Sequence, residues 1–366
     1  MVEFIQNIHS QIFDPERLPV AIVAVLLVFL FGMFKSPPGG FTTPILWALL
    51  DKLFGKMGAK MDQSGRLSGD LIFRGFLLTI FALSIFFLFG RFADRALASM
   101  PYDLIINALV LSFTMASGSS VFALAMLYKA LNKKQVVEGA YYRIARSTRT
   151  NLSKSDDYTI TRVGIGMILR SFDKGVIAPV LWYLIFGFSG AFIYTALAGL
   201  SWRFGRDGHN KHFGQTAMAL ERLLGFVPNM MAGFFIAVAG LFTPTASMRK
   251  SFMGWMMSKG GALYEEGGFP LTSAAWGLTV SLGGPTNDID GHAIKRNWVG
   301  PQKATAQLEP IHLHRVIYLI IIAHILFIAA LAGAMIFGEN TIVSGLFEQI
   351  GSFGSSIASN GLDFFQ

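Results

Sequence analysis

Residues 281–298, SLGGPTNDIDGHAIKRNW, form a polar stretch that contains two aspartates, a histidine, a lysine and an arginine. Asp288 and Asp290 follow a glycine–proline turn and are separated by one residue. Carboxylate oxygens are the ligands that Mg²⁺ prefers, so the pair is a candidate magnesium site. Glu265 and Glu266 stand at the other end of the same glycine-rich region, and a fold-back would bring four carboxylates together. The alternative is a solvated loop whose acids face neighbouring basic residues.

A second group of candidates is basic. Arg170 and Lys174 flank Asp173 at the start of a hydrophobic segment. Guanidinium and ammonium groups recognise phosphate and carboxylate, so these residues are candidates for holding an anionic ligand. The alternative is that they hold the headgroups of anionic lipids. The candidates for this role are Arg143, Arg146, Arg162, Arg170, Lys174 and Arg296.

The composition assigns these residues to a membrane protein. The chain has 366 residues, of which 53% are hydrophobic and only 14% charged, which is more apolar surface than one soluble core buries. It has no cysteine, which excludes disulfides and thiolate sites. We expect contact with membrane lipid and no protein-bound metal site beyond the acidic candidates. We also expect no nucleic-acid partner, because loops that flank a membrane account for the formal charge of +8.

The hydropathy pattern predicts an all-α, polytopic integral membrane protein with about six hydrophobic segments in a single membrane domain, 1–366. Each segment is about long enough to cross a hydrocarbon core. The segments are Leu18–Phe34, Leu71–Gly90, Leu104–Tyr128, Val176–Leu200, Leu223–Met248 and Val316–Gly338.

Two of these segments are interrupted. LIFGFSGAF, residues 184–192, has two glycines in the middle of a segment, and GFVPNMMAG, residues 225–233, has a proline near its start. Either is a candidate re-entrant hairpin. If both re-enter, four true spans remain.

The distribution of Lys and Arg predicts the orientation. The loops after the first, third and fifth segments hold 5, 10 and 7 of them, and every other loop holds at most 4. The positive-inside rule therefore predicts that these three loops are cytoplasmic, in a protein of the bacterial inner membrane; they include a basic helical loop at 133–175 and a glycine-containing loop at 249–315. Apolar residues at helical spacing in 340–366 predict an amphipathic tail at the outer interface.

Two runs of residues carry a resemblance to a known family. DKGVIAPVLWYLIFGFSGAFIYTALAG, residues 173–199, resembles the Asp-Gly-Val-Val-Ala-Pro-Leu-Phe run and the following glycine break of the CobD/CbiB family. GGFPLTSAAWGLTVSLGG, residues 267–284, is similar to that family's Gly-Trp-Pro-Glu-Ala-Ala segment with its later Leu-Gly-Gly. The likeness covers residues 112–300. A weaker likeness links APVLWYLIFG to the AmpE membrane family.

The resemblance implies the CobD/CbiB fold and an adenosylcobinamide-phosphate synthase, which joins an aminopropanol group to a corrinoid carboxylate with ATP and Mg²⁺. Several acids of the family pattern are replaced here: Lys174 stands at the family's aspartate, Ala198 at an asparagine, Ser201 at an aspartate and Leu271 at a glutamate. The acids left as catalytic candidates are Asp173, Glu221, Glu265, Asp288 and Asp290.

Three functions follow as hypotheses. Loss of acids with retention of glycine, proline and apolar positions favours a non-synthase binding, regulatory or assembly subunit, with other membrane subunits or a second copy as partner and no assured cofactor. The alternative is a cobalamin-biosynthesis enzyme that uses ATP and Mg²⁺. A transporter or channel component is a third, weakened because His324 is the one ionisable group deep in a predicted span. Whether the protein is an enzyme stays open.

Overall fold

The structure, a computed structural model, describes residues 11–12, 14–34, 42–63, 65–98, 103–133, 139–205, 212–257, 259–289, 291 and 293–338. Asp290 and the tail predicted at 340–366 lie outside the described residues. The prediction of an amphipathic tail therefore stays a prediction.

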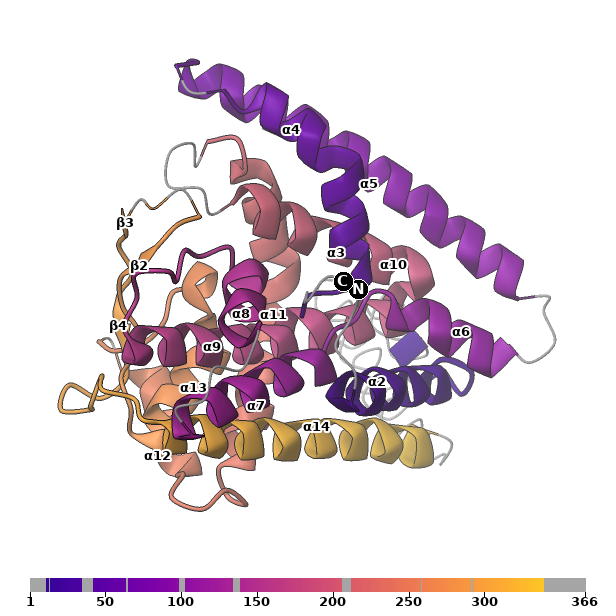
Figure 1. Ribbon diagram of the computed structural model, residues 1–366. Helices are drawn as coiled ribbons and strands as arrows, with labels where there is room; N and C mark the ends of the chain where they lie inside the picture. Colours follow the sequence, from indigo (N-terminus) through magenta and orange to yellow (C-terminus); the bar gives the residue numbers. More distant parts are fainter. Residues whose placement is uncertain are drawn as a thin grey trace, which may run out of the picture.

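The described chain is almost wholly helical (Figure 1). Its helices are α2 Arg17–Phe34, α3 Ile45–Leu50, α4 Lys56–Met61, α5 Ser68–Leu97, α6 Asp103–Ser112, α7 Gly118–Lys133, α8 Ala140–Thr148, α9 Asp157–Phe172, α10 Ala178–Phe204, α11 Gln215–Ala239, α12 Met248–Met256, α13 Gly268–Leu278 and α14 Pro310–Gly338. Two π-helical turns, η2 Asp51–Gly55 and η3 Asp173–Ile177, and one 3₁₀ turn, η4 Tyr264–Glu266, join some of them.

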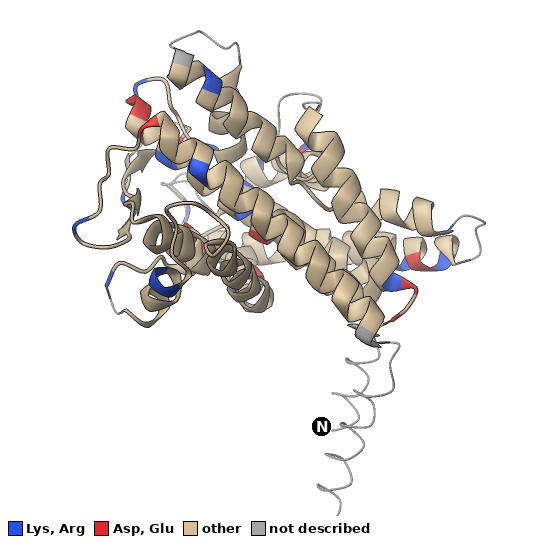
Figure 2. Cartoon of the chain, turned by 90° about the horizontal axis from the view of Figure 1, so that it is seen from below, with Lys and Arg blue, Asp and Glu red and all other residues tan. Residues whose placement is uncertain are grey.

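Five helical stretches among the described residues are long and apolar enough to cross a membrane: Arg17–Phe34, Ser68–Leu97, Asp157–Phe204, Gln215–Ala239 and Pro310–Ile336. Large apolar side chains such as Phe31, Phe92 and Leu223 are exposed on them, as expected of surfaces that face lipid. In Figure 2 most charged residues lie at helix ends and in loops. The prediction of an all-α polytopic membrane protein is confirmed, whereas the orientation stays a prediction.

Helices α2, α7 and α14 contact one another, and α14 runs beneath both α2 and α7 in Figure 1. α2 and α7 approach closely at Gly32 and Gly118, where a Cβ on either glycine would collide with the backbone of the other helix. Small residues permit such close backbone contact between helices in a membrane. The packing of α2 on α7 thus depends on these two glycines.

The predicted third segment, Leu104–Tyr128, is divided into α6 and α7 by the break at 113–117. The break is buried against η3: the Ala116 amide donates to the Gly175 carbonyl at 3.0 Å. Ser117 at the end of the break hydrogen-bonds Nε2 of His324, whose Nδ1 lies 2.7 Å from the Ile320 carbonyl. His324 is therefore a buried imidazole bonded to a neighbouring segment, with both ring nitrogens engaged.

The fourth hydrophobic segment turns back on itself at Gly187. This glycine has φ 67° and ψ −155°, which is not helical and which only glycine adopts readily. A Cβ on Gly190 would overlap the carbonyl oxygen of Trp182, whereas residues eight apart in a continuous helix are separated by about 12 Å. Of the two interrupted segments, this one forms a hairpin, and α11 runs as one helix through Pro228.

Two charged side chains satisfy the backbone groups that the turn at Gly187 leaves open. Arg17, at the start of α2, donates to the Leu184 carbonyl at 2.9 Å. Asp94, near the end of α5, accepts from the Phe188 amide at 2.9 Å and from the Ser189 hydroxyl at 2.8 Å. A cation thus sits at the carboxyl end of the first leg and an anion at the amino end of the second, as the helix dipoles favour.

The polar loop at 281–298 folds back as two short antiparallel ladders. β1 Leu282–Gly283 pairs with β4 Trp298–Val299, and β2 Thr286–Asn287 pairs with β3 Ala293–Ile294. The Asn151 amide donates to the Asn287 carbonyl at 3.1 Å, which ties the loop to the segment between α8 and α9. This hydrogen bond places the folded loop beside the segment that leads into α9.

We predict that Asp94→Ala lowers the free energy of unfolding by about 1–3 kcal/mol, because it leaves the Phe188 amide and the Ser189 hydroxyl without their acceptor. Asp94→Asn, which keeps one carbonyl oxygen, should lose less. Thermal unfolding of the purified protein in detergent measures both.

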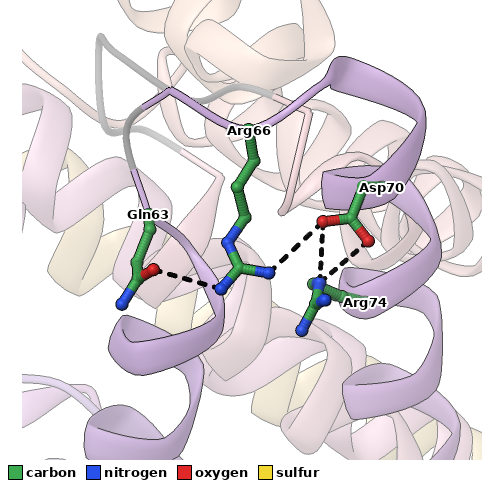
Figure 3. A network of polar contacts seen from close by, with 4 residues as sticks. All are labelled: Gln63, Arg66, Asp70 and Arg74. Carbon is green, nitrogen blue, oxygen red and sulfur yellow. Dashed lines mark hydrogen bonds and ion pairs between the residues drawn. The ribbon is translucent and has the colours of Figure 1, made fainter.

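Asp70→Ala is the matched control on the same helix. Asp70 accepts from Arg66 and Arg74 in an open network that also includes Gln63 (Figure 3). Exposed ion pairs contribute little, so its melting temperature should match that of the unmodified protein. Equal losses for the two variants would contradict the role given to Asp94.

Candidate functional site

The candidate site begins at η3, where Asp173 and Lys174 are buried between α9 and α10. Gly175 approaches Ala116 so closely that a Cβ there would lie 2.5 Å from the Ala116 carbonyl oxygen. This contact with the 113–117 break accompanies the change from α- to π-helix. Single π-helical turns within α-helices are frequent at functional sites, because they turn side chains out of the regular α-helical positions.

Lys174 makes an ion pair with Glu221 of α11. Its Nζ lies 2.8 Å from Glu221 Oε1, and the two side chains are 10% and 2% exposed. The same carboxylate oxygen accepts from the Tyr264 hydroxyl at 2.6 Å and from the Tyr194 hydroxyl at 3.3 Å. The Lys174 ammonium also lies 4.9 Å from the centre of the Tyr264 ring. The negative charge of Glu221 is thus balanced by Lys174, and its Oε1 accepts hydrogen bonds from two tyrosines.

Asp173 is held by Asn229, about two turns beyond Glu221 along α11. Asn229 Nδ2 donates to Asp173 Oδ2 at 2.7 Å, and Asn229 Oδ1 accepts from the Phe269 amide at 2.9 Å. The second oxygen of Asp173, Oδ1, is buried and has no hydrogen-bond partner among the described residues. This oxygen is therefore an acceptor of the buried cluster that is free to bind a further donor.

Tyr264 reaches this cluster from η4 because Gly225 leaves room for it. A Cβ on Gly225 would overlap the Tyr264 hydroxyl, which also donates to the Glu221 carbonyl at 3.2 Å. Burial, and after it the negative charge of Glu221, raise the pKa of Tyr264. Its hydroxyl therefore stays protonated and acts as a donor to Glu221.

A second cluster, here named the arginine pocket, is a small cavity of about 30 Å³ that three guanidinium side chains line. Arg162 is anchored in its wall: it donates to the Gly283 carbonyl at 2.9 Å and to the Thr159 hydroxyl at 2.8 Å, and it stacks on Trp298. Arg170 and Arg296 also line the cavity. The space holds roughly two water molecules.

Arg170 and Arg296 make no ion pair or hydrogen bond with a carboxylate in the described part of the chain, although Glu266 stands in the same wall. Burial lowers the pKa of Arg296, and the charges of Glu266 and Asp288 oppose that shift. Two adjacent guanidiniums without an ion-paired carboxylate are the arrangement that a phosphate or carboxylate group completes.

The other predicted residues lie apart from these two clusters. Arg143 stacks on Phe122, and Arg146 donates to the Tyr142 hydroxyl at 2.8 Å. Glu265 forms an ion pair with Arg222 on the surface. Asp288 is buried, and its Oδ1 accepts from the amide of the next residue at 2.6 Å.

Among the described residues, no group of three or more His, Asp or Glu side chains is placed to hold a metal ion. The fold-back of the polar loop therefore does not bring the four carboxylates, as far as they are described, into one acidic site. Glu265 and Asp288 each have a separate setting, and Asp290 lies outside the described residues.

Sequence reasoning missed Asn229 and Tyr264. A signal for Asn229 is present, since an uncharged polar side chain between Gly225 and Gly233 in an apolar helix indicates a helix contact and a bonded partner. No local signal marks Tyr264, because its contacts with Glu221 and Lys174 join parts of the chain that are far apart in sequence.

A family model for the CobD/Cbib protein matches residues 21–320. The chain belongs to the CobD/CbiB family. This span includes both clusters, three of the five long apolar stretches in full, and parts of the first and the last.

Curated members of the CobD/CbiB family resemble the chain at low identity. The Cobalamin biosynthesis protein CobD of Dehalococcoides mccartyi is 23% identical over 268 residues, which cover 70% of this chain and 84% of that protein. A Probable cobalamin biosynthesis protein CobD of Methanococcus maripaludis is 23% identical over 313 residues, 84% of this chain and 92% of the relative. The Cobalamin biosynthesis protein CobD of Brucella anthropi is 22% identical over 284 residues, 73% and 83% of the two chains. No solved structure matches.

The Mg²⁺ and ATP that the CobD/CbiB resemblance implies need carboxylate oxygens that face a common space. Around Glu221 the described residues provide a different set, because the Lys174 ammonium and two tyrosine hydroxyls already engage Oε1. Asp173 has one free oxygen, but its other oxygen is held by an amide. The donor set at this place does not fit a magnesium–nucleotide site.

We predict that Lys174→Met lowers the free energy of unfolding by about 3–5 kcal/mol, because it leaves the Glu221 carboxylate buried without its counter-charge. The double variant Lys174→Met, Glu221→Gln should recover most of that loss. Thermal or denaturant unfolding of the single and double variants in detergent measures the coupling. Additive losses would show that the ion pair is not coupled in this way.

Proposed function

We propose that this CobD/CbiB-family protein acts in cobalamin biosynthesis as a non-synthase binding subunit of the bacterial inner membrane, with its basic loops cytoplasmic. Its ligand is an anionic group, phosphate or carboxylate, of a corrinoid-pathway intermediate, and the arginine pocket binds that group. The role in cobalamin biosynthesis is supported by the family match and by relatives named for that process.

One observation carries the binding role: Arg170 and Arg296 line one cavity and neither forms an ion pair in the described chain. Like charges in a partly buried space repel each other, so bringing them together costs free energy unless an anion binds between them. Arg162, which is anchored to Gly283 and Thr159, provides a fixed wall for that anion.

The charges of the buried cluster support the non-synthase part of the proposal. Lys174 stands at the position where the family pattern has an aspartate and supplies the positive charge beside Glu221. The fold of a family does not carry its activity when the residues of the site differ. Contact of the basic loops with a partner subunit or a second copy belongs to this proposal.

We predict that Arg296→Met and Arg170→Met each weaken the binding of inorganic phosphate at least tenfold, since each removes a charged donor from the arginine pocket. Isothermal titration in a neutral detergent measures the affinity. Arg143→Met is the matched control, because Arg143 stacks on Phe122 and does not line the pocket. An equal loss in all three variants would point to net charge alone.

The same titration separates a soluble ligand from lipid. In nanodiscs of phosphatidylcholine, phosphate should bind as in detergent. The contrary result is that phosphate binding by the unmodified protein is abolished in nanodiscs that contain phosphatidylglycerol, while Arg296→Met behaves alike in the two lipids. In that case the pocket serves a lipid headgroup and the proposal of a corrinoid ligand is wrong.

A second candidate function is the synthase itself, and one observation favours it: two of the predicted acids, Asp173 and Glu221, belong to the same buried cluster, and Asp173 Oδ1 is unpartnered among the described residues. We predict no product when the purified protein is given adenosylcobyric acid, ATP, Mg²⁺ and aminopropanol phosphate. Product detected by mass spectrometry, and lost in Asp173→Asn, would favour the synthase over the binding subunit.

A further inference from the structure

The three residues of η4 point their side chains at three different partners. Tyr264 donates to Glu221 and lies under the Lys174 ammonium. Glu265 forms an ion pair with Arg222, the next residue of α11. Glu266 lines the arginine pocket, where its Oε1 accepts from the Asn297 amide at 3.4 Å. One short turn therefore connects the buried ion pair with the arginine pocket.

The turn is a compact unit. The Gly267 and Gly268 amides close it by donating to the Tyr264 carbonyl at 3.2 Å and the Leu263 carbonyl at 2.9 Å. Gly267 has φ 130°, which side chains other than glycine rarely adopt. Before the turn, the Gly260 carbonyl accepts from the Trp276 indole at 2.9 Å and from the Gly300 amide at 2.9 Å. The turn is thus held at Gly260 on one side and bordered by glycines on the other.

The arginine pocket is too small for its proposed ligand while Glu266 stays in place. Its space of about 30 Å³ admits roughly two water molecules, fewer atoms than a phosphate group has oxygens. The Glu266 carboxylate would also repel an entering anion, because the low dielectric of a partly buried site strengthens repulsion between like charges. Its Oε2 is buried without a hydrogen-bond partner among the described residues.

A larger cavity lies on the other side of the same turn. It has a volume of about 270 Å³, and Tyr264, Asn229, Trp255, Phe226 and Phe269 line it. Tyr264 separates this cavity from the Lys174–Glu221 pair, since its ring covers the ammonium and its hydroxyl meets the carboxylate. Movement of the turn would open the pair to the cavity.

We propose that η4 is a lid which an anion opens: Glu266 in the wall of the arginine pocket narrows the pocket and repels the ligand's anionic group, and an anion that displaces Glu266 draws Tyr264 away from Lys174 and Glu221. This inference rests on the proposed function, because it requires anion binding by Arg170 and Arg296. It adds that ligand binding in one cluster exposes the charged pair of the other to the 270 Å³ cavity.

The test is a phosphate titration of the full-length protein in neutral detergent. Glu266→Gln removes the competing charge, so it should bind phosphate about tenfold more tightly than the unmodified protein. Glu265→Gln is the matched control on the same turn; it breaks the surface pair with Arg222 and should stay within twofold. Melting curves of both variants establish that each is folded.

Tryptophan fluorescence reports the movement, since Trp255 lines the cavity beside Tyr264. Phosphate should change the emission of the unmodified protein, and Trp255→Phe should lose that change. Phosphate that binds without changing the emission, or equal affinities of Glu266→Gln and the unmodified protein, would overturn the lid and leave the binding role standing. If phosphate binds to neither protein, both the lid and the proposed function fail.

Discussion

The ion pair between Lys174 and Glu221 is the contact on which the interior of this protein depends. A buried charge is stable only with a counter-charge and enough hydrogen bonds, because the surrounding apolar helices offer neither. Glu221 therefore fixes how α11 lies against η3, and it also fixes η4, because the Tyr264 hydroxyl bonds the same carboxylate. Three elements that are distant in sequence are positioned by one carboxylate.

The irregular backbone of the protein follows the same rule. Each place where a helix stops inside the apolar body exposes backbone groups that lipid cannot satisfy. At Gly187 the open groups are bonded by Arg17 and Asp94, and at the 113–117 break the Ala116 amide bonds the Gly175 carbonyl. The second of these lies at η3, so the structural irregularity and the candidate site coincide, as is common where function sets the local geometry.

In the two clusters, the shape of the backbone and the charges placed on it have different origins. Glycines permit the close approaches, such as that of Tyr264 to Gly225, and these depend on backbone shape alone. The charges of the site depend on the side chains and not on the shape of the backbone. The Lys174 ammonium supplies the positive charge beside Glu221, and Arg170 and Arg296 line the arginine pocket. These charges, and not the arrangement of helices, are the basis of the proposed anionic ligand.

The sequence by itself determined the class of the protein and most of its helices, because hydropathy over a span and the residues that break it are local properties. It also indicated the interruption at 184–192 and the basic residues that line the arginine pocket.

The tertiary structure decided which interrupted segment turns back: both contain glycine or proline, but only at Gly187 do Arg17 and Asp94 stand ready to bond the open backbone, whereas α11 accommodates Pro228 without a break. It also decided that Asp173 and Glu221 are both held in the buried cluster, by Asn229 and Lys174 respectively, while Glu265 and Asp288 do not join them. The physical reason is that a charge's partner is chosen by distance in space, and spacing along the chain does not contain that distance.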